Sequence, residues 1–143
     1  MRVAADTNVV VSAFLWGGPP RQVLEAARQR RIELFTSAAL FAELEEILQR
    51  DKFRMRFEAV GLTFTWVLER YLALARFVVP ASTPRVVLDD PDDDCVIAAA
   101  QAAEAERIVS GDRHLLELRS YENIRIVSAA DLVVEIMTLG QTP

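Results

Sequence analysis

The stretch Arg107-Ile108-Val109-Ser110-Gly111-Asp112 decides the fold, because a short apolar run is followed closely by an acid. The N-terminus repeats this pattern in Arg2-Val3-Ala4-Ala5-Asp6. Short runs at 32–36, 77–79 and 124–127 also read as strands, and helical patterns separate them. Strands that alternate with helices pair in parallel through crossovers. The sequence therefore predicts an α/β fold, a three-layer α/β/α sandwich with a central parallel sheet of four or five strands.

Helices are expected where apolar residues recur at helical spacing. Pro20 can occupy the first position of one helix, which runs to about Arg30, and Ser37 can cap the next. Ser128 and Asp131 resemble a capping box for the last helix. The expected helical ranges are 20–30, 38–48, 64–75, 95–106 and the segment from 129 onward.

Length and composition limit the class of protein. A chain of 143 residues fits a single domain over 1–143, and a lone cysteine excludes a disulfide scaffold. No apolar run is long enough to span a membrane, and the N-terminus does not resemble a signal peptide, so we expect a cytoplasmic protein. The net charge of −5 means that any nucleic-acid binding needs a local basic patch.

Acidic residues are expected to gather at the carboxyl edge of the sheet. Asp6 and Asp112 follow strands, Glu43 lies early in the helix after the second strand, and the acidic turn 89–94 leads into another helix. Each acid alone is ordinary as a turn, cap or surface residue. Together, however, several close carboxylates need a cation to offset their repulsion. Mg²⁺ with a substrate phosphate suits such a site and favours phosphodiester hydrolysis.

The sequence lacks the residues that other reactions carried out by α/β folds require. The first strand is followed by Asp6-Thr7-Asn8 rather than the Asp-x-Asp of dehalogenase-type phosphatases. No Gly-rich phosphate loop is present, and Lys52, the only lysine, is misplaced for a receiver domain. His114 is the only histidine, so a Ser-His-Asp triad would depend on it alone; we interpret it as a surface residue beside the Asp112 turn.

Four ordered motifs resemble those of the PIN-domain nucleases. They are Asp6-Thr7-Asn8, the segment 36–48 with Glu43, the segment 90–100 with its run of acids, and the segment 108–116 with Asp112. Their order and spacing are similar to the subgroup described as toxins of toxin–antitoxin systems, the VapC-like proteins. The resemblance covers nearly the whole chain.

The resemblance implies a Mg²⁺- or Mn²⁺-dependent endoribonuclease. It assigns catalysis and metal binding to acids at five positions, Asp6, Glu43, Asp93, Asp94 and Asp112. Thr7, Asn8 and Ser110 would be supporting polar groups that orient the carboxylates. One departure is His114, where relatives often carry another acid.

The sequence leaves open whether Asp93 or Asp94 is the direct metal ligand in the acidic turn. A helical wheel places Asp93 below the apolar face that points into the sheet, which favours Asp93 as the ligand. Some relatives, however, carry the acid three residues before an Ile-Ala-Ala run. In this chain that spacing selects Asp94, which precedes Ile97-Ala98-Ala99. We expect Asp93 to bind and Asp94 to act as an N-cap or supporting residue.

Contacts to RNA are expected from a basic strip that alternates with apolar side chains, namely Arg50, Lys52, Arg54 and Arg56. The alternative is a solvated helix end whose phenylalanines pack inward. The apolar composition favours a homodimer and a groove for a cognate antitoxin protein. The alternatives to a toxin are a PIN nuclease of housekeeping RNA processing and a non-catalytic PIN-fold binding module.

Overall fold

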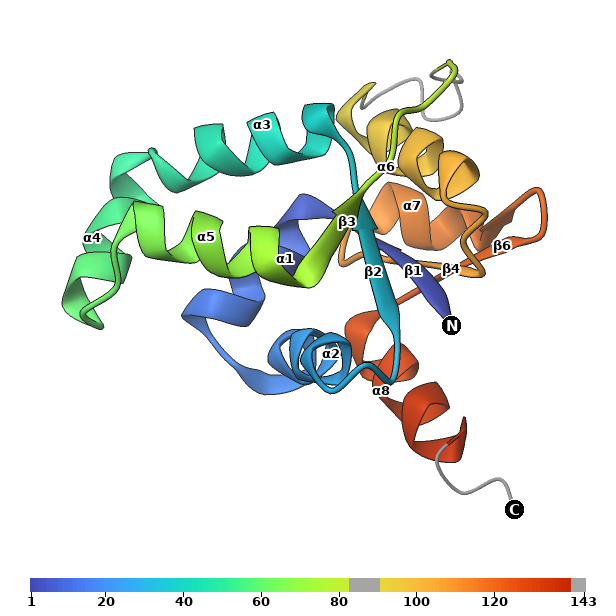
Figure 1. The fold of residues 1–143 in the computed structure, drawn as a ribbon, viewed down its shortest axis with the longest axis horizontal. Coiled ribbons are helices and arrows are strands. Elements are labelled where there is room, and N and C mark those ends of the chain that lie inside the picture. The colour runs from blue at the N-terminus through green and yellow to red at the C-terminus, as the bar shows by residue number, and fades with distance from the viewer. Residues whose placement is uncertain (83–90, 140–143) are drawn as a thin grey trace.

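The computed structural model of the chain describes residues 1–82 and 91–139, without the side chains of 91 and 92. The strands in these ranges form one sheet in the order β3-β2-β1-β4-β6-β5 (Figure 1). They are β1 (Arg2–Ala5), β2 (Glu33–Thr36), β3 (Ala75–Phe77), β4 (Arg107–Val109), β5 (Ser120–Tyr121) and β6 (Ile124–Val127). In this part of the chain five strands pair in parallel, as predicted, and the two-residue β5 adds a sixth, antiparallel strand.

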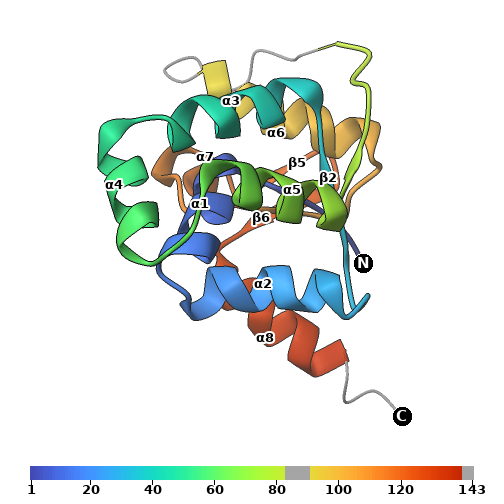
Figure 2. The ribbon, with the colours of Figure 1, turned by 60° about the vertical axis from the view of Figure 1, so that its left-hand side comes forward.

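Helices cover both faces of the sheet and complete the predicted α/β/α sandwich. They are α1 (Thr7–Leu15), α2 (Gly18–Arg28), α3 (Ala38–Leu48), α4 (Asp51–Ala59), α5 (Phe64–Leu74), α6 (Pro91–Ala102), α7 (Arg113–Leu118) and α8 (Ala129–Leu139). One core joins alternate strand residues such as Val3 and Leu34 to α1, α2 and α8. A second core joins Ala4 and Ile108 to α6 and α7 on the opposite face. Figure 2 shows α2 and α8 side by side below the sheet, with α6 above it.

Two predicted helix starts are confirmed by side-chain caps. The Ser37 Oγ accepts a hydrogen bond from the Leu40 N–H at 3.3 Å. The Ser128 Oγ accepts one from the Asp131 N–H at 3.1 Å. Each bond satisfies an N–H group that a helix start leaves without a backbone partner. None of the described helices is long and apolar enough to cross a membrane.

Helix α1 was not expected, and α4 was expected only as the end of a preceding helix. The run Val9-Val10-Val11 is β-branched and disfavours a helix by intrinsic propensity. All three valines are buried against the sheet, so tertiary packing stabilises α1 where propensity does not. Strand β3 begins at Ala75, directly after α5, instead of at the predicted residue 77.

Helix α6 lies earlier in the chain than predicted. It runs over Pro91–Ala102 instead of 95–106, because Pro91 takes a first-turn position in which its missing N–H costs nothing. It ends in a reversal at Glu104, whose φ is 52°, and the Ala105 N–H bonds to the Ala100 carbonyl at 2.9 Å. Residues 89 and 90 of the expected acidic turn lie outside the described residues.

Candidate functional site

The sheet has a topological switch point between β1 and β4. From β1 the chain continues to β2 and β3 on one side, whereas β4 and β6 lie on the other. The register pairs Ala5 with Val109, so Asp6 and Ser110 come next to each other at the carboxyl edge. Open α/β sheets bind their ligands at this kind of crevice. The structure therefore brings Asp6 and the Asp112 turn to the predicted edge.

Ser110 links these two acidic segments. Its side chain is fully buried, and its Oγ donates a hydrogen bond to the Asp6 Oδ2 at 2.7 Å. The same Oγ accepts a hydrogen bond from the Asp112 N–H at 2.9 Å. Because one hydroxyl holds both groups, the position of the Asp6 carboxylate is tied to the position of the Asp112 turn.

Asp112 is the N-cap of α7. Its Oδ1 accepts hydrogen bonds from the His114 N–H at 2.8 Å and the Leu115 N–H at 3.2 Å. No described residue hydrogen-bonds its Oδ2, and the side chain is 22% exposed. The cap fixes the orientation of the carboxylate through Oδ1, while Oδ2 takes no part in the cap. This arrangement suits a metal ligand, which must be held in place.

A group of three potential ligands converges beside this turn. Asp93, Asp112 and His114 each offer one ligand atom, and these atoms lie within 4.8 Å of one another. Asp93 comes from the first turn of α6 and is 4% exposed. Asp94 follows it and is equally buried, at 5% exposed. The positive end of the α6 dipole offsets part of the negative charge of both acids.

The donor set fits a divalent cation. Two carboxylates and an imidazole within this distance match the ligands that Mn²⁺ and related ions take in proteins. In addition, the Thr7 Oγ1 is buried and has no hydrogen-bond partner among the described residues. Buried hydroxyls are nearly always paired, so this atom is available to a bound ion, water or substrate. The residues at this edge therefore fit a metal.

Comparison with known families agrees with this geometry. The family model described as a PIN domain matches residues 2–114. The chain belongs to the PIN domain family. PIN domains are generally metal-dependent nucleases, so the group of two acids and a histidine is a candidate metal site of this PIN domain. No curated protein matches the chain.

Sequence reasoning missed His114 as a member of this group. We interpreted it as a surface residue, and its side chain is indeed 40% exposed. The start of α7 at Arg113, however, turns its imidazole toward Asp112, with 4.0 Å between Nδ1 and Oδ1. The signal in the sequence was its spacing of two residues from Asp112, an acid that follows a predicted strand.

The remaining predicted site residues lie on elements at the same edge of the PIN domain but outside the three-residue group. Asp6 is the buried N-cap residue of α1, and Thr7 and Asn8 form its first turn, with Asn8 exposed. Glu43 lies in the second turn of α3 and is half-buried. Their roles in metal binding stay predictions.

The basic strip begins at Arg50, the N-cap residue of α4, and continues along α4, but its phenylalanines do not form a row of exposed stacking rings. Phe57 is buried and Phe53 half-buried, so the phenylalanines pack inward. The cations are exposed, and two of them pair with acids: Arg50 with Glu46 at 3.8 Å and Arg54 with Asp51 at 3.0 Å. A third, Arg56, lies 3.5 Å above the ring of the exposed Trp16. The strip therefore offers charge and the Trp16–Arg56 pair, and its role in RNA binding stays a prediction.

Proposed function

We propose that this PIN domain is a Mg²⁺- or Mn²⁺-dependent endoribonuclease that hydrolyses RNA phosphodiester bonds. The observation that carries the proposal is the convergence of Asp93, Asp112 and His114 at the switch point, with Ser110 joining Asp112 to Asp6. Acids concentrated at one edge repel a phosphodiester unless a cation lies between them. A nuclease role therefore requires the metal that the donor set fits.

Asp93 and Asp112 would hold the ion, with Asp6, Glu43 and Asp94 as the other candidate acids. A bound divalent ion would polarise the phosphodiester and make the attacking water more acidic. The chain's own residues orient the site: Ser110 holds the Asp6 carboxylate, the α7 cap holds Asp112, and Thr7 and Asn8 supply polar groups beside Asp6.

The direct test is cleavage of a single-stranded RNA by the purified chain. We expect activity with Mn²⁺ or Mg²⁺, none in excess EDTA, and recovery when the metal is returned. Asp6→Asn should lower the rate by orders of magnitude, since it removes a charge and keeps the shape. The matched control is Asp131→Asn, an exposed acid on α8, which should cleave normally. Full activity in excess chelator would refute the metal mechanism.

The choice between the two acids of α6 needs its own comparison. We expect Asp93→Asn to reduce cleavage and Mn²⁺ affinity more than Asp94→Asn, because the ligand atom of Asp93 lies near those of Asp112 and His114. Both residues are nearly fully buried, so loss of solvent contact cannot explain a difference between the variants. The reverse ranking would assign the ligand to Asp94.

The basic residues Arg50, Lys52, Arg54 and Arg56 are proposed to bind the RNA backbone. Charge supports this role, since these four cations are exposed on a chain whose net charge is −5. The double variant Lys52→Gln/Arg56→Gln should raise the KM for RNA and flatten its salt dependence, with kcat little changed. An unchanged KM and salt slope would exclude α4 from the RNA path.

We further propose that the chain is a cytoplasmic, single-domain toxin that forms a homodimer and binds an antitoxin protein. Exposed apolar side chains support an interface, among them Val134 at 62% and Met137 at 56% exposed on α8. Light scattering should give about twice the 16.0 kDa chain mass. Induced expression should arrest growth, and expression of Asp6→Asn should not. Normal growth with an active nuclease would favour a housekeeping role.

A further inference from the structure

Trp16 is an exposed aromatic side chain with a cation stacked on its ring. Both tryptophans of the chain are exposed, Trp16 at 58% and Trp66 at 41%. Trp66 packs edge-on against Phe14, with ring centres 6.2 Å apart, whereas Trp16 has no aromatic partner among the described residues. The guanidinium of Arg56 lies 3.5 Å from the centre of the Trp16 ring. One face of this ring is therefore covered by a cation, and its high exposure leaves the other face to solvent.

The backbone around Trp16 is held in place. Trp16 is the C-cap residue of α1, and its N–H donates a hydrogen bond to the Ser12 carbonyl at 2.8 Å. The Arg21 Nε donates one to the Ala13 carbonyl at 3.1 Å, which ties α2 to the last turn of α1. Gly17 then reverses the chain with a φ of 79°, in the left-handed region that favours glycine. The ring thus projects from a fixed turn.

This turn lies within reach of the acidic site. Helix α1 begins directly after Asp6 and ends at Trp16, so the two residues are about 15 Å apart along the helix axis. Figure 2 shows α4, which carries Arg56, beside the end of α1. A single strand with its nucleotides stacked at about 3.4 Å covers this length with about four nucleotides. An RNA bound at the acids can therefore extend to Trp16.

Charge favours a nucleotide over a protein as the group that covers Trp16. In the basic strip, Arg50 and Arg54 pair with acids. No described acid forms an ion pair with Arg56. A protein surface that buried the ring would also take the Arg56 guanidinium out of water, which is costly unless an anion pairs with it. A nucleotide supplies a flat base for the ring and a phosphate for the guanidinium.

The spacing of the two groups agrees with one continuous strand. A base stacked about 3.4 Å from the open face of the ring is about 7 Å from the guanidinium on the other face, which equals about two stacked nucleotide steps. A phosphate one or two nucleotides along the strand can therefore reach Arg56. We propose that Trp16 stacks on an unpaired base of the RNA substrate and that Arg56 binds a phosphate beside it. This proposal rests on RNA as the substrate of the acidic site, and it makes the enzyme selective for single strands.

The first test uses tryptophan fluorescence, with a short single-stranded oligoadenylate as the probe and EDTA to prevent metal-dependent cleavage. Trp66→Phe leaves Trp16 as the only tryptophan, and the oligonucleotide should quench its fluorescence saturably. Trp16→Phe leaves only Trp66, whose fluorescence should be quenched much less. An RNA duplex of the same length should quench Trp16 less than the single strand, because its bases are already paired and stacked. Equal quenching of the two tryptophans, or equal quenching by duplex and single strand, overturns the proposal.

The second test measures affinity by the fluorescence anisotropy of a labelled oligoadenylate, again in EDTA. Trp16→Ala should weaken binding about five- to hundredfold, the effect of losing one base–aromatic stack. Trp16→Tyr keeps a ring and should retain most of the affinity. The matched control is Leu72→Ala, an exposed apolar residue on α5, with unchanged affinity. In cleavage assays with metal, Trp16→Ala should raise the KM for a long single strand and leave the KM for a dinucleotide, which is too short to reach Trp16, unchanged.

The two tests separate this proposal from the nuclease function. Cleavage of RNA with unchanged oligoadenylate affinity in Trp16→Ala would overturn the stacking role and leave the nuclease function standing. Binding that depends on Trp16, without cleavage in Mn²⁺ or Mg²⁺, would support the stacking role and refute the nuclease function. A Trp16→Ala variant that becomes monomeric with unchanged RNA affinity would assign the ring to a contact between copies of the chain and overturn the proposal.

Discussion

Ser110→Ala tests the link between the two acidic segments. The change removes a buried hydrogen bond of 2.7 Å to the Asp6 carboxylate and leaves the Asp112 N–H without its acceptor. A hydrogen bond to a charged group is worth about 1.5–3 kcal/mol, and a partly buried N–H left unpaired costs about 1 kcal/mol more. We therefore expect a loss of about 2.5–4 kcal/mol in the free energy of unfolding.

The matched control is Ser128→Ala, which removes an exposed cap of α8 with the same chemistry. A cap of this kind contributes about 1 kcal/mol. If the free energy of unfolding falls by roughly 2 kcal/mol per molar urea, the urea midpoints of Ser110→Ala and Ser128→Ala should differ by about 1 M.

The Ser110→Ala variant should also bind metal less well. Without Ser110 the Asp6 carboxylate loses its orientation, and loss of such an orienting group lowers metal affinity by about 10–100-fold. Ser128→Ala should leave Mn²⁺ affinity unchanged. Equal losses of stability in the two variants, together with an unchanged Mn²⁺ affinity for Ser110→Ala, would refute the reasoning.

Three other predictions concern separate parts of the chain. Burial raises the pKa of the Tyr71 hydroxyl, so its neutral form is favoured in the folded state; stability should fall as pH rises above about 10, the unfolded pKa, and urea midpoints of Tyr71→Phe should fall less over this range. His114→Ala should weaken Mn²⁺ binding more than Mg²⁺ binding in parallel titrations, since an imidazole favours the softer ion; equal losses would remove His114 from the ligand set. Leu44→Ala leaves a cavity at a side chain that is 1% exposed, and urea unfolding should show a loss of about 2–5 kcal/mol, against little for the exposed Leu72→Ala.

Local patterns predicted the parts of the site that follow strands. Asp6 and Asp112 could be placed at one edge because parallel strands end on the same side of a sheet, and the register of Ala5 with Val109 agrees with that placement. The caps at Ser37 and Ser128 were also predictable, since each depends on residues three apart in the sequence.

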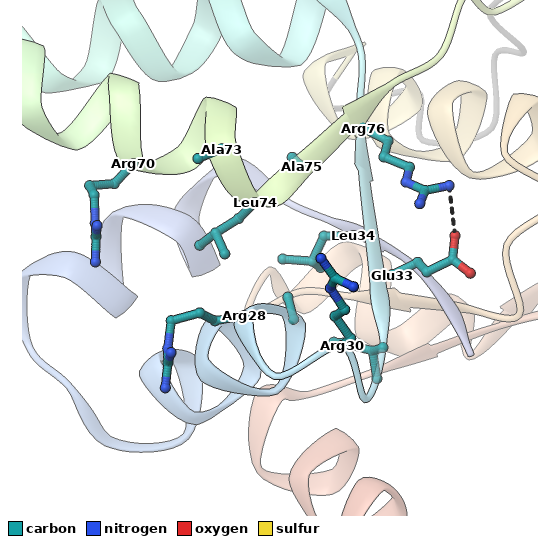
Figure 3. A pocket seen from close by; sticks show the side chains of 11 residues that line it. Arg28, Arg30, Glu33, Leu34, Arg70, Ala73, Leu74, Ala75 and Arg76 are labelled. Carbon is teal, nitrogen blue, oxygen red and sulfur yellow. Dashed lines mark ion pairs between the residues drawn. The ribbon is translucent and has the colours of Figure 1, made fainter.

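Tertiary packing determines the features that local sequence patterns do not predict. Propensity disfavours α1 at Val9-Val10-Val11, and only the buried face that these valines share stabilises it. His114 joins Asp93 through the meeting of α6 and α7, two helices whose contact no local pattern encodes. One cavity (Figure 3) is lined by four arginines that come from α2, α5, β3 and a turn, so their convergence is visible only in the folded chain.

The central claim is that acids from α6 and the β4–α7 turn bind a divalent ion at the switch point. Mn²⁺ titration of the metal-free chain, followed by electron paramagnetic resonance, tests it most directly. We predict saturable binding in the unsubstituted chain, an affinity at least about tenfold lower in Asp112→Asn, and an unchanged affinity in Asp131→Asn. Absence of saturable Mn²⁺ binding, or equal affinity in Asp112→Asn and the unsubstituted chain, would contradict it.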